Sequence, residues 1–449
     1  MIKSTARRGR TGIPLFLLLL LYLVIVLAPI GLSAALGIPR RQFRDELASA
    51  LAMIGFAMML VEFVLSGRFR IISDRIGIDL TMRFHQLIAW ALLAFLLVHP
   101  LMYQTAWSAS QSALPGTRLG LTGASAISGA LALLLLMGLV AIAAFRDQSG
   151  NPYEAWRAVH GLGAIAIAIL AMHHTLVAGH YSSHPVLVVY WSVLLTVALL
   201  SFAYVHLITP LRQLRTPYRV TSNRQIALRT WELTVEPVDG PALEFMAGQF
   251  VWLTLDRSPF AITEHPFTIS SSPAERARIM FTIKEAGDFT GQIGNVPVGA
   301  RAYLDGAHGN FTLSGREGAG LAFIAGGVGL APIISILRLL QSERDPRPMV
   351  LLYGNRVQEQ IMYMAELDAM SQTLNLAVHY VLSEPPQGWA GLTGELDEPN
   401  LRRCLDGQDR NNWLYFVCGP TPMIDSVEDT LGKLGVPLRQ IVSEKFKYD

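Results

Sequence analysis

The sequence contains only two cysteines, Cys404 and Cys418, among 449 residues. Two cysteines are too few for a disulfide framework, a four-cysteine zinc site or an iron–sulfur cluster. Any redox metal in this protein must therefore be held by other side chains. The sequence also lacks a large excess of charge of either sign, because the formal net charge is only +2. This balance gives no electrostatic basis for nucleic-acid binding, and we expect no such partner.

Charged residues are scarce in the first half of the chain, which is dominated by long apolar runs. The runs that are long enough to cross about 30 Å of hydrocarbon cover approximately residues 13–36, 47–65, 84–103, 123–145, 157–178 and 186–208. The first run follows a basic segment, as in a signal peptide, but its length and the lack of a clear cleavage site favour a retained span. We therefore predict a multi-pass membrane protein in contact with lipid.

The distribution of arginine predicts the orientation of these spans. An inside N-terminus places most loop arginines inside, among them Arg68 and Arg70. Arg40, Arg41 and Arg44 in the first outer loop oppose this rule. The balance still favours a cytoplasmic N-terminus, and an even number of spans returns the C-terminus to the same side.

The pattern changes after Pro210. Short alternating runs separated by Pro and Gly predict a small antiparallel β-barrel. From Gly318 onward, strands alternate with helices, with a helix expected at 359–371, which predicts a doubly wound parallel sheet. We therefore predict three domains, with these boundaries: a six-helix transmembrane domain (1–214), an antiparallel barrel domain (215–315) and an α/β nucleotide-binding domain (316–449).

Histidines recur at matched positions in two predicted spans. His85 and His99 lie fourteen positions apart in the third span, and His160 and His174 repeat this spacing in the fifth, with His173 adjacent. Fourteen helical residues rise about 21 Å and return to within roughly 40° of the same face. Two such helices could hold two stacked haems, each with an imidazole on either side of the iron.

Other interpretations of these histidines stay open. A single histidine in a membrane helix is more often a helix–helix hydrogen bond than a ligand, but two matched pairs favour haem. A regular helix favours His174 as the fourth ligand, whereas a local bulge would favour His173.

A run of aromatic and hydroxyl residues follows a barrel-like strand and is suited to a flavin. An aromatic ring can lie on the flat flavin ring, while hydroxyls and amides bond its polar atoms. A glycine turn that enters a helix comes next and is suited to a pyrophosphate. The predicted flavin-binding residues are His265, Pro266, Phe267, Thr268, Ser270, Ser271, Lys284, Gly287, Asp288, Phe289 and Thr290.

A glycine-rich turn between a predicted strand and helix is suited to a nucleotide phosphate. Its candidate residues are Gly326, Gly327, Val328, Gly329 and Pro332. Arg356, after the next strand, could hold a 2′-phosphate, which favours NADPH over NADH.

A third glycine turn closes a later strand and consists of Cys418, Gly419 and Pro420. It would place a thiol where nicotinamide meets flavin. The alternative is a buried cysteine in a tight turn.

With these motifs in this order, the sequence resembles the NADPH oxidase and ferric reductase superfamily across nearly its full length. The resemblance implies two b-type haems on the paired histidines, FAD at His265-Pro266-Phe267-Thr268, and NADPH or NADH at the glycine turn. Phe446 matches the family's C-terminal aromatic residue, which stacks on the flavin, although three residues follow it here. The resemblance thus implies catalytic roles for Phe446 and Cys418, and a location in a bacterial inner membrane.

The predicted function is electron transfer from cytoplasmic NADPH, through FAD and two haems, to an acceptor on the opposite side of the membrane. O2, which would give superoxide, is the first candidate acceptor, and a ferric chelate is the second. A membrane-anchored flavin reductase that serves a separate protein partner is a third interpretation. No feature of the sequence indicates an oligomeric state.

Overall fold

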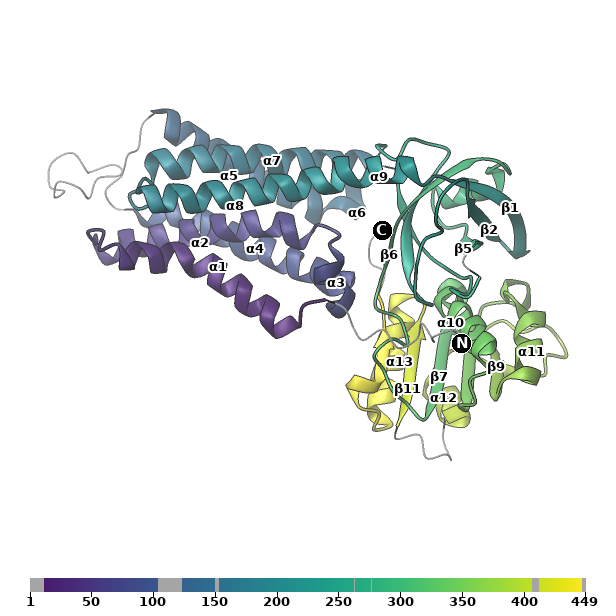
Figure 1. Cartoon of the computed structure of the whole chain (residues 1–449). Coiled ribbons are helices and arrows are strands. Elements are labelled where there is room, and N and C mark those ends of the chain that lie inside the picture. Colours follow the sequence, from purple (N-terminus) through teal and green to yellow (C-terminus); the bar gives the residue numbers. More distant parts are fainter. Residues whose placement is uncertain are drawn as a thin grey trace. The chain divides into compact units, whose positions relative to one another are not determined.

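The computed structural model describes residues 12–103, 123–149, 153–261, 263–275, 277–405 and 412–445 (Figure 1). The chain divides into two compact units. The helical unit comprises Gly12–Ile72 and Leu80–Thr209. The sheet unit comprises Ser73–Asp79 and the chain from Pro210 onward. Each unit is described by itself below.

Long apolar helices build the helical unit, and six of those within the described residues are long and apolar enough to cross a membrane. They are α1 (Leu15–Ala35), α2 (Phe43–Leu65), α4 (Ile78–Met102), α5 (Gly123–Ala144), α7 (Tyr153–Ala178) and α8 (Pro185–Ala203). The predicted six-helix transmembrane arrangement is confirmed. Two short helices, α3 (Arg70–Ile76) and α6 (Arg146–Ser149), lie between these helices in the sequence.

The last long helix does not stop at its apolar end. A π-helical turn, η2 (Tyr204–Ile208), follows α8 and leads directly into α9 (Thr209–Arg215). We call the end of the helical unit at which α8 passes into this turn the exit end, and the opposite end the far end.

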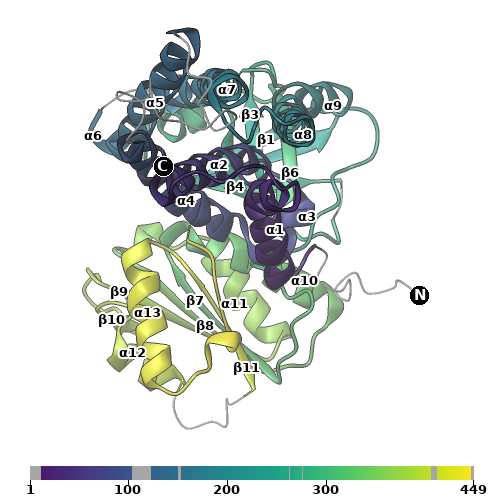
Figure 2. The same cartoon turned by 90° about the vertical axis from the view of Figure 1, so that its left-hand side faces the viewer.

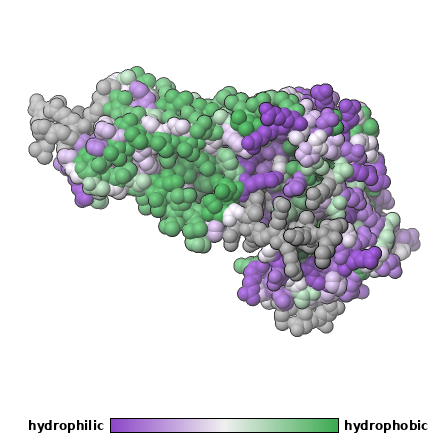
Figure 3. Space-filling model, in the orientation of Figure 1, coloured by the Kyte–Doolittle hydropathy of each residue, from purple (hydrophilic) through white to green (hydrophobic). Residues whose placement is uncertain are grey.

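Apolar side chains cover the outside of the helical unit as well as its interior. Leu20, Leu134 and Leu200 expose more than half of their surface, and the surface of this unit is mainly hydrophobic in Figure 3. The interior is apolar too, with Trp191 among the fully buried side chains. Apolar residues on both sides of a helix are expected where lipid rather than water surrounds the protein.

The sheet unit begins with a six-stranded antiparallel sheet. Its strands are β1 (Tyr218–Ala227), β2 (Thr230–Pro237), β3 (Phe250–Leu255), β4 (His265–Thr268), β5 (Ile279–Lys284) and β6 (Arg301–His308). The spatial order is β4-β3-β6-β1-β2-β5. The two outermost strands approach each other, because Ile269, just after β4, forms a bridge with Phe281 on β5. The predicted antiparallel β-structure is therefore present, with its two edges brought together.

A parallel sheet forms the rest of this unit (Figure 2). Its strands are β7 (Gly320–Gly326), β8 (Met349–Asn355), β9 (Leu376–Leu382), β10 (Leu392–Thr393), β11 (Trp413–Cys418) and β12 (Ile441–Ser443), in the order β10-β9-β8-β7-β11-β12. Helices α10 (Leu330–Glu343) and α11 (Met364–Thr373) pack on one face, and α12 (Glu398–Leu405) and α13 (Thr421–Lys433) pack on the other. This arrangement confirms the predicted doubly wound fold.

Helix α11 begins five residues later than the predicted start at 359. Gln358–Gln360 form a short 3₁₀ turn instead. Tyr363, just before the helix, has a left-handed backbone with φ 55°. A bulky residue in this conformation interrupts a right-handed helix, so the helix can start only after it.

A partly buried ionic cluster joins the two sheets. Arg338 on α10 donates two hydrogen bonds to Glu366, of 2.6 and 2.8 Å, and one to the carbonyl of Ser270. The hydroxyl of Tyr363 donates to Glu232 on β2. Bidentate arginine–carboxylate pairs fix geometry as well as adding energy, so this cluster holds the nucleotide-binding sheet against the antiparallel sheet.

Candidate functional site

Two predicted motifs meet at the carboxyl edge of the parallel sheet. Strands β7 and β11 are neighbours, with Ala325 paired to Cys418. From β7 the chain continues to β8 on one side, while β11 lies on the other side. This is the point where the strand order reverses, at which open α/β sheets bind ligands. The glycine turn after β7 and the Cys418-Gly419-Pro420 turn after β11 both begin here.

Two glycines of the first turn have separate structural roles. Gly327 has φ +53°, a left-handed conformation that favours glycine. Gly329 packs against the next turn, because a Cβ atom there would lie 2.2 Å from the carbonyl oxygen of Cys418. Helix α10 starts at Leu330 with Pro332 in its first turn, so its N-terminal amides face the carboxyl edge of the sheet. The predicted nucleotide motif thus forms a strand–turn–helix suited to a phosphate.

Arg356 follows the neighbouring strand β8. Its exposed side chain forms an ion pair with Glu384, with an Nε–Oε1 distance of 2.8 Å. Exposed pairs of this kind are weak because water screens the charges, so a phosphate could replace the carboxylate at little cost.

The predicted flavin motif brings three aromatic rings together. The rings of His265 and Phe289 are stacked with centroids 4.1 Å apart, and Phe267 lies 5.9 Å from Phe289. Pro266 and Thr268 alternate with His265 and Phe267 along β4, and all four residues pair with β3. A cluster of flat side chains beside a half-buried strand provides a surface on which an isoalloxazine ring can lie.

The glycine turn of this motif is held by its own threonine. The Thr290 hydroxyl accepts hydrogen bonds of 2.9 Å from the amides of Ala286 and Gly287. These two amides therefore already have an acceptor. Asp288 lies in the same turn, and Lys284 ends β5 opposite Thr230.

Ser270 and Ser271 connect the flavin motif to α10. Arg338 donates to the Ser270 carbonyl, and the Ser335 hydroxyl donates to the Ser271 carbonyl at 2.6 Å. The Ser271 hydroxyl accepts from the amide of Met280. These carbonyl contacts join the motif to the nucleotide-binding helix, while the Ser270 hydroxyl is buried without a hydrogen-bond partner among the described residues, so the predicted contact of the hydroxyls with the flavin stays a prediction.

Glu444 lies beside this site, and sequence reasoning assigned it no role. Strand β12 pairs with β11 so that Ser443 lies opposite Val417, which brings the following residues, Glu444 and Cys418, close together. One Glu444 oxygen accepts from the amide of Asn310 at 3.3 Å. The other is buried and has no hydrogen-bond partner among the described residues. Phe446, two positions further on, lies outside the described residues.

Burial changes the acid–base properties of both groups. Burial and the nearby charge of Asp79 raise the pKa of Glu444 from 4.5 to about 8. Burial, together with the Glu444 carboxylate, raises the pKa of Cys418 to about 12. Cys418 is therefore a neutral thiol at physiological pH, suited to packing beside a ring rather than to nucleophilic attack.

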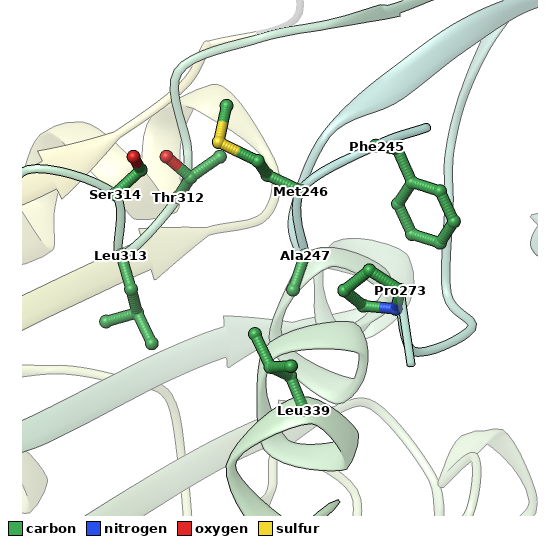
Figure 4. Close-up of a pocket in the computed structure, with 8 residues that line it drawn as sticks. All are labelled: Phe245, Met246, Ala247, Pro273, Thr312, Leu313, Ser314 and Leu339. Carbon is green, nitrogen blue, oxygen red and sulfur yellow. The ribbon is translucent and has the colours of Figure 1, made fainter. Parts of the chain in front are cut away.

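A small hollow lies where the antiparallel sheet meets α10 (Figure 4). Its lining comprises residues 245–247, Pro273, residues 312–314 and Leu339. Its volume of about 30 Å³ has room for a water molecule rather than a nucleotide. It contains none of the predicted site residues and is a packing feature.

In the helical unit, two predicted ligands face each other. The rings of His85 on α4 and His160 on α7 have centroids 6.2 Å apart and planes inclined by 71°. An iron–imidazole bond of about 2.0 Å, with the ring centre about 1 Å behind the nitrogen, places two axial rings about 6 Å apart. The observed separation fits two imidazoles on opposite sides of one iron.

The pair lies at the exit end. The ring of Phe202, near the end of α8, packs beside Gly161. The Ser201 hydroxyl donates to the carbonyl of Phe63, near the end of α2. Among the described residues, no cluster of three or more His, Cys, Asp or Glu side chains is placed to hold a metal ion, but a haem iron needs only two.

Hydrogen bonds orient four of the five candidate histidines through Nδ1. The partners are Glu62 for His85 (2.8 Å), the Leu96 carbonyl for His99 (2.7 Å), the Ser128 hydroxyl for His173 (2.9 Å) and the Ser125 carbonyl for His174 (2.8 Å). A carbonyl acceptor requires the proton on Nδ1, which leaves the Nε2 lone pair for a metal. The Nδ1 atom of His160 has no such bond within the described part of the chain.

Helix α7 is a regular α-helix through His173 and His174. The condition under which His173 would be the better ligand, a local bulge, is therefore not met. His174 lies within electrostatic range of His99. Gly129 on α5 makes room for the His174 ring, because a Cβ atom there would lie 2.5 Å from Nδ1.

The far end carries a buried polar network centred on Arg41. The guanidinium donates to the Ser49 hydroxyl, lies 3.8 Å from Glu46 and stacks near Tyr103 and Tyr181. Only 4% of the Arg41 side chain is exposed. One of the three arginines that oppose the charge rule is therefore a buried, paired group rather than a surface charge. Tyr103 also contacts the ring of His99.

Three family models match the chain in order. The ferric reductase like transmembrane component matches residues 51–171, the FAD-binding domain matches 230–310, and the oxidoreductase NAD-binding domain matches 323–429. The site and these matches define a transmembrane, flavin-dependent NAD(P)H oxidoreductase. The chain has the domain architecture of the NADPH oxidase and ferric reductase superfamily.

Curated reductases match about half of this chain. NADH-cytochrome b5 reductase 1 of Laccaria bicolor is 32% identical over 44% of this chain and 65% of its own length. The aligned part thus spans less than two thirds of that relative. Ferredoxin–NADP reductase B of Sorangium cellulosum is 29% identical over 51% of this chain and 96% of its own length. These matches confirm an NAD(P)H oxidoreductase.

Among solved structures, a flavohaemoglobin from Malassezia yamatoensis aligns with a TM-score of 0.51 at 17% identity, over 90% of this chain and 99% of its own. The ferredoxin reductase of carbazole 1,9a-dioxygenase aligns with a TM-score of 0.46 at 26% identity, over 51% and 69%. The flavohaemoglobin match supports the fold alone.

The close packing of Gly329 gives a testable prediction. Gly329→Ala places a methyl group against the Cys418 carbonyl and separates the two turns, so NAD(P)H-dependent ferricyanide reduction should fall about tenfold or more. Gly432→Ala is the matched control, because it lies in α13 with nothing within 4 Å of the new methyl group. A Gly329→Ala variant that keeps the wild-type rate would contradict this role.

The position of Glu444 gives a second prediction. Its folded-state pKa lies above the ordinary value of 4.5, so its contribution to stability is complete below that pH and is lost as pH rises through about 8. The thermal unfolding midpoint of the wild type should therefore fall between pH 5 and 9. Glu444→Gln, which cannot ionise, should flatten that profile. The control, exposed Glu384→Gln, should leave it unchanged, and identical profiles for Glu444→Gln and wild type would refute the assignment.

Proposed function

We propose that the protein moves electrons from cytoplasmic NADPH to an acceptor on the opposite side of a bacterial inner membrane, using FAD and two b-type haems, with O2 as the acceptor and superoxide as the product. The observation that carries this proposal is the 6.2 Å separation of His85 and His160 inside an apolar bundle. His99 and His174 supply the second pair at the far end. Both chain termini then lie in the cytoplasm.

The chain's own residues divide the work. His85 with His160, and His99 with His174, would present Nε2 to one iron each, and the regular geometry of α7 favours His174 over His173 as the fourth ligand. When bound, FAD would take the two electrons of one hydride and release them singly to haem, a conversion that neither nicotinamide nor the side chains present can perform.

In the sheet unit, the aromatic cluster around Phe289 supports the flavin from one side. The turn from Gly326 to Gly329 holds the nucleotide phosphates. The neutral Cys418 thiol packs at the crevice between the turns, and buried Glu444 holds a proton beside it. By the family resemblance, Phe446 would be the aromatic residue that stacks on the flavin.

Two groups favour the finer assignments. Arg356 is exposed and exchangeable from Glu384, which supports a 2′-phosphate and hence NADPH. At the far end, Arg41 is buried and paired near His99, so this arginine does not offer an exposed charge to an anionic chelate. A small neutral molecule such as O2 reaches such a site more easily than a bulky chelate.

Ferric-chelate reduction is the second candidate, and the match of residues 51–171 to the ferric reductase like component favours it. A membrane-anchored flavin reductase with a separate protein acceptor is the third, favoured by the b5 reductase and ferredoxin reductase relatives. Only the first two need haem within this chain.

The haem ligands can be tested directly. The reduced-minus-oxidised absorbance spectrum of purified protein should show b-type haem at two per chain. His85→Ala and His99→Ala should each remove one haem, because an iron with a single imidazole is held weakly. His180→Ala, at an exposed histidine that contacts Pro39, should keep both. A preparation without a Soret band after haem supplementation would leave only the flavin reductase alternative.

The acceptor requires a parallel assay. Haem-loaded protein is given NADPH or NADH, and superoxide-dismutase-sensitive reduction of a dye is compared with formation of a ferrous chelate. We expect a faster superoxide signal with NADPH than with NADH, because only NADPH has the phosphate that Arg356 can bind. Faster ferrous chelate formation that is insensitive to superoxide dismutase would replace O2 by ferric iron as the acceptor.

A further inference from the structure

Glu62 is an acidic residue deep in a transmembrane helix with a specific partner. It lies near the exit end of α2, and its side chain is 6% exposed. One oxygen, Oε2, lies 2.8 Å from Nδ1 of His85, and the other is buried without a hydrogen-bond partner among the described residues. A carboxylate in hydrocarbon is costly and usually serves a function.

We propose that Glu62 is a positioning residue that lowers the reduction potential of the haem at the exit end. This inference rests on the proposed function, because it requires His85 to bind a haem iron. It assigns to Glu62 a role in electron transfer rather than in helix packing.

The physical basis is the hydrogen bond to the ligand. A carboxylate that accepts the Nδ1 proton makes the imidazole a stronger electron donor through Nε2 and fixes its orientation. The carboxylate also adds a negative charge close to the iron, separated from it by the imidazole ring of His85 alone. A ferric haem carries one more positive charge than a ferrous haem, so this charge stabilises the oxidised state, and the low dielectric of the bundle screens it little.

The two ends of the bundle differ in this respect. At the exit end, Nδ1 of His85 faces a carboxylate. At the far end, Nδ1 of His99 and of His174 face neutral backbone carbonyls. Of the acidic residues near the far end, Glu46 is balanced by Arg41 and by a hydrogen bond from Tyr181, and Asp45 is buried in the first turn of α2. Glu62 therefore acts on one haem and not on the other.

Such a difference would favour electron movement away from the exit end. A lower potential at the first haem makes transfer to the second more favourable. The hydrogen bond between Glu62 and His85 would then set the preferred direction of electron transfer between the two haems, whichever acceptor is used.

Potentiometric titration of the two haems tests this proposal without measuring turnover. Glu62→Gln keeps the size of the side chain and removes the charge. At a fixed potential we expect about a tenfold higher ferrous-to-ferric ratio in one haem, equivalent to about 59 mV for a one-electron couple, and no change in the other. A His160→Ala variant, left with the far-end haem, identifies which potential belongs to which site.

The matched control is Asp45→Asn on the same helix. Asp45 is also buried, and it lies seventeen residues away, about 26 Å along the helix. It should leave the exit-end potential unchanged. Equal shifts of both haems in Glu62→Gln, or no shift in either, would overturn the proposal while the haem count still supports the proposed function.

If Glu62→Gln loses one haem, its potential cannot be measured, and the haem content of Glu62→Asp then tests the proposal. The shorter carboxylate retains the charge, so recovery of the second haem would support a positioning role for Glu62. A second haem still missing in Glu62→Asp would overturn it. A wild-type protein without any haem would instead refute the proposed function itself.

Discussion

The helical unit depends on one constraint, which is that a polar side chain in hydrocarbon is costly unless it has a partner. Water is absent there, so each unmatched donor or acceptor costs several kcal/mol. The imidazoles of His85, His99 and His174 meet this requirement through Nδ1. Their second nitrogens point elsewhere, and the same hydrogen bonds that make histidine tolerable in the bundle also select its ligating atom.

In the sheet unit, space rather than polarity is the main constraint. The two turns at the end of β7 and β11 approach so closely that a side chain on Gly329 would collide with backbone. This approach places the nucleotide turn, the Cys418 thiol and Glu444 within one small region. The ionic cluster of Arg338 and Glu366 then holds the flavin motif against the helix that starts at that region.

Sequence patterns predicted the repeating parts of this protein well. Apolar runs of membrane length and alternating strands and helices are local signals, so the six spans and the doubly wound sheet followed from them. The partners of the site residues did not follow, because Glu62 and His85 are 23 residues apart and Asn310 and Glu444 are 134 apart. Glu62 was noticeable only as a charge in an apolar run. The burial of Arg41 depends on residues that are distant in the sequence, such as Tyr103 and Tyr181, so no local pattern predicts it.

The burial of both cysteines has a practical consequence. Cys404 and Cys418 are buried, neither forms a disulfide, and the thiol of Cys418 has a pKa of about 12. Maleimide reagents attack exposed thiolates, so the folded native chain should react with them very little. A single cysteine introduced at Leu438, which is 81% exposed, would then carry a spin or fluorescent label at one defined point, and no native residue would have to be removed first.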